Sequence, residues 1–205
     1  LNKIFNKVLS SGHYVGGKYI EEFEKNMSKY CNTKYCVSLN SGTDALVLAL
    51  HLLGVRKGDE VITTPNSFIA STAVIVHLGA VPVFVDVLED QNINPDLIEK
   101  KITNKTKVIM PVHLTGRVSR MSKILKIAKK YNLKVVEDAA QSVGSMYKNK
   151  KSGSFGDIGC FSAHPLKNLN AVGDAGYLTT NSKNIYDRIK DLRNHGMSNR
   201  NIVKN

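Results

Sequence analysis

The stretch Phe161-Ser162-Ala163-His164-Pro165-Leu166-Lys167-Asn168 begins at the end of a short apolar run and sets one lysine among small and polar residues. A lysine amine held partly out of water can lose its proton and attack a carbonyl carbon. Most lysines are instead solvated on the surface, and a lone lysine in a chain with 29 Lys and Arg would ordinarily be one of them. The meaning of Lys167 therefore depends on the rest of the chain.

An apolar run upstream, Val135-Val136-Glu137-Asp138, delivers an aspartate at the expected carboxyl end of a strand, where ligands bind in open α/β sheets. Enzymes that use pyridoxal phosphate (PLP) need a lysine to hold the cofactor's aldehyde and a carboxylate to keep its pyridine nitrogen protonated. Asp138 and Lys167 supply these two groups. We therefore predict that both residues bind PLP and act in catalysis.

A PLP site also needs a place for the phosphate, and Ser41-Gly42-Thr43 offers one at the start of an expected helix. The free N–H groups and the dipole at a helix start favour an anion. Gly42 and Thr43 are the predicted phosphate contacts, and the hydroxyl of Ser162 is expected to join them. Taken alone, the same residues are equally typical of an ordinary capped helix.

These motifs follow one order along the chain: Ser41-Gly42-Thr43-Asp44-Ala45-Leu46, then Glu137-Asp138-Ala139-Ala140-Gln141, then Phe161-Ser162 with His164 and Lys167-Asn168. Their combination resembles the DegT/StrS family of PLP-dependent sugar aminotransferases, which belong to the aspartate aminotransferase fold type. Sequence similarity to the family extends from Tyr19 through Asn194-His195-Gly196, so the resemblance covers nearly the whole chain.

The resemblance implies cofactor contacts for three further residues. Phe68 matches an aromatic residue that lies against the cofactor ring, Gln141 a neighbour of the ring hydroxyl, and His164 a residue that helps orient the lysine loop. The residue types alone leave alternatives open, since Phe68 fits a core position and the other two fit structural hydrogen bonding. His113 is predicted to be a strand-end histidine with backbone partners rather than a cofactor contact.

The resemblance also implies a reaction, the transfer of an amino group from a donor such as glutamate to a keto group of a nucleotide-linked sugar. Two alternatives stay open. One is a PLP-dependent sugar dehydratase or other PLP chemistry on the same fold, although the dehydratase relatives replace the lysine by histidine. The other is a catalytically incompetent cofactor-binding or regulatory fragment. Thr115 and Arg117 occupy positions where a common sequence motif of the family has tyrosine and glutamine. This difference leaves the substrate subclass open.

Short apolar strands alternate with amphipathic helices along the chain, which predicts an α/β fold, a three-layer α-β-α arrangement around a mainly parallel sheet. The resemblance identifies this fold as the large domain of the fold-type I PLP-dependent transferases. Strands are expected at 35–39, 60–63, 81–86, 107–114, 134–137, 156–161 and 177–180, and helices at 19–30, 45–53, 69–78, 94–102, 119–131 and 182–192.

Residues 1–205 are expected to form this large PLP-binding domain, with the amphipathic helix at about 19–30 packed outside the sheet. The chain starts at Leu1 rather than methionine and ends in the polar run 201–205. We interpret it as a fragment that lacks the smaller C-terminal domain of the resembled family. The resemblance further implies a homodimer whose active sites lie at the subunit interface.

The composition indicates which classes of partner and which cellular compartment to expect. The formal net charge of +12 comes with lysines scattered along the chain, without an aromatic-interleaved basic stripe, so no nucleic-acid partner is expected. No stretch approaches the ~20 apolar residues of a membrane span. Cys31, Cys36 and Cys160 show no metal-ligand spacing and argue against a disulfide framework, which indicates a reducing, cytoplasmic setting and no metal site.

Overall fold

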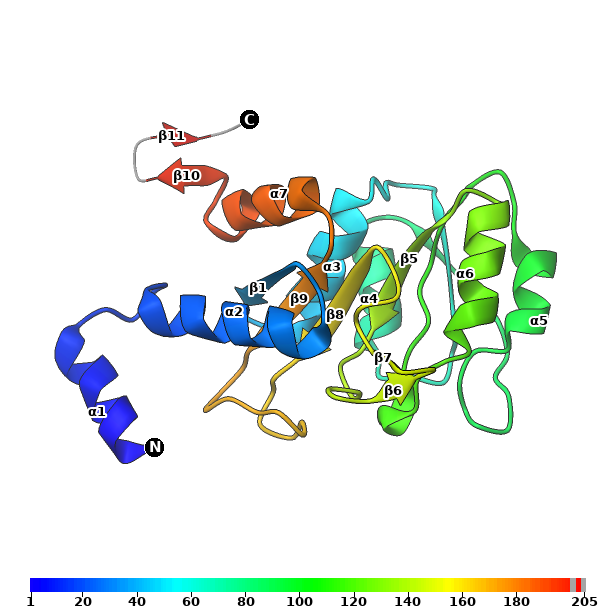
Figure 1. Cartoon of the computed structure of the whole chain (residues 1–205). Helices are drawn as coiled ribbons and strands as arrows, with labels where there is room; N and C mark the ends of the chain where they lie inside the picture. The colour runs from blue at the N-terminus through cyan, green and yellow to red at the C-terminus, as the bar shows by residue number, and fades with distance from the viewer. Residues whose placement is uncertain (200–201, 204–205) are drawn as a thin grey trace.

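The computed structural model describes residues 1–199 and 202–203 and is built on a seven-stranded sheet (Figure 1). The strands are β1 (Tyr35–Leu39), β2 (Glu60–Thr63), β3 (Val81–Phe84), β4 (Thr106–Ile109), β5 (Lys134–Asp138), β8 (Ile158–Ser162) and β9 (Gly176–Thr180). They lie in the order β1-β9-β8-β5-β4-β2-β3. β9 runs antiparallel to β1 and β8, and all other neighbours pair in parallel, as predicted for a mainly parallel sheet.

Helices cover both faces of this sheet. They are α2 (Lys18–Cys31), α3 (Gly42–Leu52), α4 (Ala70–His77), α5 (Pro95–Ile98), α6 (Met121–Lys130) and α7 (Lys183–Arg193). Side chains alternate along each strand, so Val61 and Val108 join the core beneath α3, α4 and α7, whereas Ile62 and Ile109 join the core beneath α5 and α6. α2 packs on a third cluster, against β1, β8 and β9. The predicted three-layer α/β fold is confirmed.

The sheet brings the predicted site residues to one edge. β5 ends at Asp138, which pairs with Cys160 of β8, and β8 ends two residues later at Ser162. The start of α3 packs against this strand end, because Gly42 lies next to Ser162. Chain segments that are far apart in the sequence therefore meet at the carboxyl ends of β5 and β8.

Three elements differ from the sequence-based expectation by more than small shifts of their ends. The helix α1 (Asn2–Ser11), which the sequence pattern did not predict, has no buried residue and projects from the body of the fold (Figure 1). β4 ends at Ile109 rather than at 114, and beyond it the pairing with β5 continues only as an isolated bridge from Val112 to Asp138 among the described residues. The helix expected at 94–102 divides into α5 and a 3-10 turn, η1 (Glu99–Lys101).

The remaining elements are short. They are the 3-10 turn η2 (Leu114–Gly116), the hairpin of β6 (Met146–Tyr147) and β7 (Lys150–Lys151), and the pair β10 (Met197–Asn199) and β11 (Ile202–Val203). Residues 200, 201, 204 and 205 of the polar end lie outside the described residues. Within the described ranges, every helix is too short or too polar to cross a membrane.

Candidate active site

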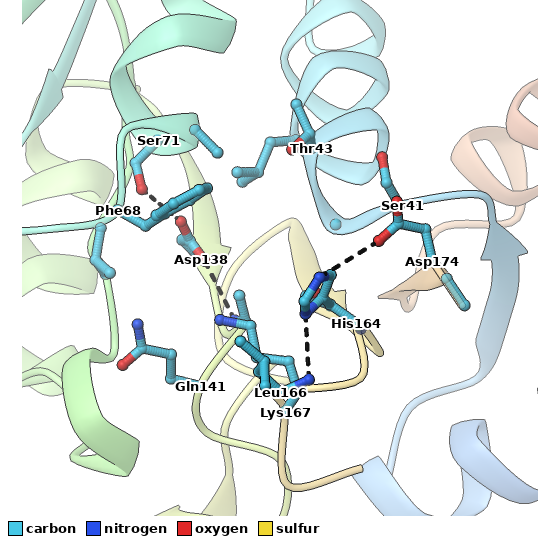
Figure 2. A pocket seen from close by; sticks show the side chains of 17 residues that line it. Ser41, Thr43, Phe68, Ser71, Asp138, Gln141, His164, Leu166, Lys167 and Asp174 are labelled. Carbon is cyan, nitrogen blue, oxygen red and sulfur yellow. Dashed lines mark hydrogen bonds and ion pairs between the residues drawn. The ribbon is translucent and has the colours of Figure 1, made fainter. Parts of the chain in front are cut away.

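A cavity of about 370 Å³ opens at this edge of the sheet, and all eight residues predicted to bind the cofactor line it (Figure 2). They are Gly42, Thr43, Phe68, Asp138, Gln141, Ser162, His164 and Lys167. They come from the start of α3, the segment before α4, the end of β5 and the connection from β8 to β9. The structure thus brings the whole predicted set together.

Asp138 is a buried carboxylate in the cavity wall, with 5% of its surface exposed. Its Oδ2 accepts a hydrogen bond from Ser71 Oγ at 2.7 Å, and its Oδ1 accepts the Ala140 N–H at 3.2 Å. Both donors are neutral, and Asp138 forms no ion pair with any residue that the structure describes. Because a buried carboxylate without a cationic partner is costly, this position suits a ligand that brings a positive charge.

Lys167 lies half-buried in the connection between β8 and β9. Its N–H donates to His164 O at 2.8 Å, and the Leu166 N–H donates to His164 Nδ1 at 3.2 Å. His164 Nε2 in turn lies 3.9 Å from Asp174 Oδ1. His164 therefore has contacts that fix the shape of the lysine loop, while Lys167 Nζ has no ion-pair partner in the described part of the chain.

The start of α3 forms the end of the cavity beside Ser162. Ser41 Oγ accepts the Asp44 N–H at 3.0 Å, which leaves the N–H groups of Gly42 and Thr43 without an acceptor inside the helix. A Cβ on Gly42 would lie 2.7 Å from Ser162 Cβ, so only glycine lets the helix start approach the strand end this closely. Two N–H groups and the hydroxyls of Thr43 and Ser162 make this end suitable for an anion.

Phe68 and Gln141 complete the wall. Phe68 is 67% exposed and lines the cavity, so the alternative of a core phenylalanine is wrong. It lies just before α4, which begins at Ala70 with Ile69 as its N-cap, within one residue of the expected start. Gln141 Oε1 accepts the Thr115 N–H at 2.9 Å, so its side chain both faces the cavity and ties the wall to η2.

His113 is fully buried and lies outside the cavity lining. Its Nε2 lies 2.9 Å from Glu137 Oε2, and its Nδ1 accepts the Ser119 N–H at 3.2 Å. The expectation of backbone partners was therefore only half right, because the main partner is a buried carboxylate. Glu137 also accepts three backbone N–H groups, those of Gly153, Phe155 and Gly156.

Sequence reasoning missed two polar residues of the wall, Ser71 and Asp174. Ser71 is a buried hydroxyl in a helix whose other buried residues are apolar, and this contrast was the available signal. Asp174 is exposed in the turn before β9, where nothing in the sequence distinguishes it from a loop residue. The rest of the lining consists of Ser41, Leu46, Ala70, Val112, Ala140, Leu166 and Ala175.

The chemistry of this donor set fits PLP. The start of α3, with its N–H groups, suits the phosphate, the amino group of Lys167 suits the aldehyde, and the carboxylate of Asp138, which has no ion-pair partner among the described residues, suits the protonated ring nitrogen. The exposed face of Phe68 suits the ring itself. The glycine at position 42 leaves room that any side chain would fill.

Several known proteins are similar to this chain in sequence and in fold. The chain is 46% identical over 197 residues to the dTDP-3-amino-3,6-dideoxy-alpha-D-galactopyranose transaminase of Aneurinibacillus thermoaerophilus. The matched region covers 96% of this chain and 54% of that relative. It is 41% identical over 191 residues to the dTDP-3-amino-3,4,6-trideoxy-alpha-D-glucose transaminase of Streptomyces venezuelae, with 93% and 50% covered. The crystal structure of S. venezuelae DesV in complex with ketimine intermediate matches with a TM-score of 0.96 and 38% identity, over all of this chain and 55% of that one.

The chain thus spans about half the length of the curated relatives it matches. The solved neighbour confirms the expected α/β fold. The model of a family described as the DegT/DnrJ/EryC1/StrS aminotransferase family matches residues 1–205. This protein belongs to the DegT/DnrJ/EryC1/StrS aminotransferase family.

Proposed function

We propose that the protein is a PLP-dependent aminotransferase that moves an amino group, from a donor such as glutamate, to a keto group of a nucleotide-linked sugar. The observation that carries this proposal is the meeting of Lys167, Asp138 and the start of α3 around one cavity. The names of the two dTDP-sugar transaminases among the relatives support the acceptor class.

The chemistry of each residue sets its task. Asp138 would hold the positive charge of the ring nitrogen, and the N–H groups of Gly42 and Thr43 would hold the phosphate together with the hydroxyl of Ser162. Lys167 would hold the aldehyde and then carry the proton at the reacting carbon of the substrate. When bound, PLP supplies an electron sink for the pair of electrons that this proton leaves behind.

The first half of the reaction tests this function. PLP-loaded protein is mixed with glutamate, and the release of 2-oxoglutarate and the change in cofactor absorbance are followed. We expect both signals from the parent and from Lys100→Ala, an exposed lysine outside the cavity, but neither from Lys167→Ala. A dehydratase or an incompetent cofactor-binding fragment would release no 2-oxoglutarate.

A chemical readout separates the role of Lys167 from a loss of folding. Borohydride reduction followed by peptide mass spectrometry should place a pyridoxyl group on Lys167 of the parent and on no residue of Lys167→Ala. A pyridoxyl group fixed at another lysine in the parent, or parental turnover in Lys167→Ala, would overturn the assignment.

We also propose that residues 1–205 are the large domain of a longer protein with a smaller C-terminal domain, and that the complete protein is a homodimer. The relatives are about twice as long as this chain. Large apolar side chains stay exposed on the cavity lining, namely Phe68 at 67% and Leu166 at 88%, and in segments next to lining residues, namely Ile69 at 67% and Val172 at 100%; a second copy would cover them. Light scattering on the complete protein should give the mass of two chains, and an active monomer would contradict the proposal.

We propose that the protein is cytoplasmic. Cys31, Cys36 and Cys160 are all free and buried, as suits a compartment that keeps thiols reduced. Fractionation of the source cells should recover the protein with cytoplasmic markers, and recovery with exported proteins would contradict this.

A further inference from the structure

A second depression, of about 590 Å³, lies beside the cofactor cavity and has its own lining. Arg117 and Arg120 project from the segment after β4, and the other lining residues are Asp90, Thr115, Gly116, Val118, Met146 and Tyr147. One hydrogen bond joins the two hollows, because the N–H of Thr115 in the depression donates to Oε1 of Gln141 in the cavity wall at 2.9 Å. The two hollows therefore share a wall at Gln141 and Thr115, and the arginines lie on the far side of that wall from the cofactor cavity.

The two guanidinium groups carry free positive charge. Arg117 and Arg120 are exposed, and neither forms an ion pair with any residue in the described ranges. The single carboxylate in the lining, Asp90, uses its Oδ1 to accept the Asn92 N–H at 3.1 Å. Two unpaired arginines against one carboxylate leave the depression with a net positive charge.

The backbone that carries Arg117 is held in place. Asn92 is fully buried, and its Nδ2 donates to Arg117 O at 3.2 Å while its Oδ1 accepts the Leu114 N–H at 3.2 Å. Between these bonds, Thr115 adopts the left-handed conformation, with φ 52° and ψ 26°, which is rare for a β-branched residue. Such a conformation persists only where the surroundings hold it, so Arg117 is presented from a fixed turn.

We propose that this depression binds the diphosphate of the nucleotide-linked acceptor sugar, with Arg117 and Arg120 as the phosphate contacts. The proposal rests on the proposed function and adds a site for the part of the substrate that does not react. A sugar ring held near Lys167 carries its diphosphate on the ring itself, so the phosphates must lie next to the cofactor cavity. Planar guanidinium groups pair with phosphate oxygens through two hydrogen bonds at once, which gives both affinity and orientation.

Nucleotide binding to the PLP-loaded protein tests this site without a need for turnover. Titration calorimetry compares dTDP, UDP and GDP with the uncharged nucleosides thymidine, uridine and guanosine. We expect at least one of the diphosphates to bind, and Arg117→Gln and Arg120→Gln each to weaken that binding by about tenfold while nucleoside binding stays unchanged. Arg188→Gln, on the exposed side of α7 and outside both hollows, is the matched control and should keep parental affinity.

The glutamate half-reaction separates failure of this site from failure of the proposed function, because it needs no acceptor sugar. A half-reaction that persists in both variants, together with the expected loss of nucleotide affinity, supports the site. If no diphosphate binds the parent, or if both arginine variants keep parental affinity, the site is wrong and the half-reaction still stands. If the parent itself releases no 2-oxoglutarate from glutamate, the proposed function fails first and the site falls with it.

Discussion

Replacing Glu137 by glutamine tests how strongly one buried carboxylate holds the framework of the site. Its Oε2 accepts His113 Nε2 and the Gly153 N–H, both at 2.9 Å, and its Oε1 accepts the N–H groups of Phe155 at 2.6 Å and Gly156 at 2.8 Å. A glutamine has only one oxygen, so its NH₂ group would face two of these four donors. Each buried donor without an acceptor costs about 1–3 kcal/mol, so Glu137→Gln should lower the free energy of unfolding by about 2–6 kcal/mol.

Urea unfolding followed by circular dichroism measures this loss. It is a large part of the roughly 5–15 kcal/mol that stabilises a typical domain, so a clear shift of the midpoint is expected. The matched control is Glu99→Gln, which removes an exposed carboxylate paired with Lys130 and should leave the midpoint near that of the parent. A Glu137→Gln protein that unfolds at the parental midpoint with the parental slope would refute the count of four donors.

Asp138→Asn should keep much of the PLP affinity but lose most amino transfer, because an uncharged ring is a poor electron sink; parental release of 2-oxoglutarate would contradict this. Gly42→Ala should weaken PLP binding in equilibrium dialysis, since its Cβ would lie 2.7 Å from Ser162 Cβ and push α3 away. Burial raises the pKa of Cys31 to about 11 and also raises the pKa values of the other two cysteines, so a thiol reagent at about pH 8 should label them only after unfolding. Burial, and then two nearby arginines, lower the pKa of His51 below 6.5, so the unfolded chain binds its proton more tightly. Stability should therefore fall as the pH drops from 6.5 through the lowered pKa, and His51→Gln should flatten that slope in urea melts.

The layers of the fold could be predicted because parallel strands that are buried on both faces consist of consecutive apolar residues. Adjacent residues such as Val61 and Ile62 are both apolar, since each faces one of two helix layers. The direction of β9 was also readable in principle. The connection from β8 at 163–175 contains no helical run, and a parallel partner needs a crossover that usually includes one. The helix α1 gave a weaker signal, because none of its side chains is buried and only local spacing marks it.

The site residues could be predicted where a distinctive residue type stands at a strand end, at a helix start or in the loop that follows a strand. Asp138, Gly42 and Lys167 are of these three kinds in turn, and all of them line the cavity. Ser71 could not be found in the same way, because its task exists only once α4 lies against the end of β5 and its hydroxyl meets Asp138. The turn at Thr115 is likewise a tertiary effect, since Thr is not a residue that favours the left-handed conformation.

Glu137 and Asp138 are neighbours in β5 with the same charge and opposite surroundings. Consecutive residues of a strand point to opposite faces of the sheet, so the two carboxylates enter different environments. Glu137 meets four donors that occupy both of its oxygens, which leaves little capacity for any further partner. Among the described residues, the carboxylate of Asp138 accepts hydrogen bonds only from Ser71 Oγ and the Ala140 N–H, and it faces the cavity. Because side chains alternate along β5, the carboxylate of Glu137 stabilises the fold around the site. The carboxylate of Asp138 keeps its charge and its remaining acceptor capacity for a ligand.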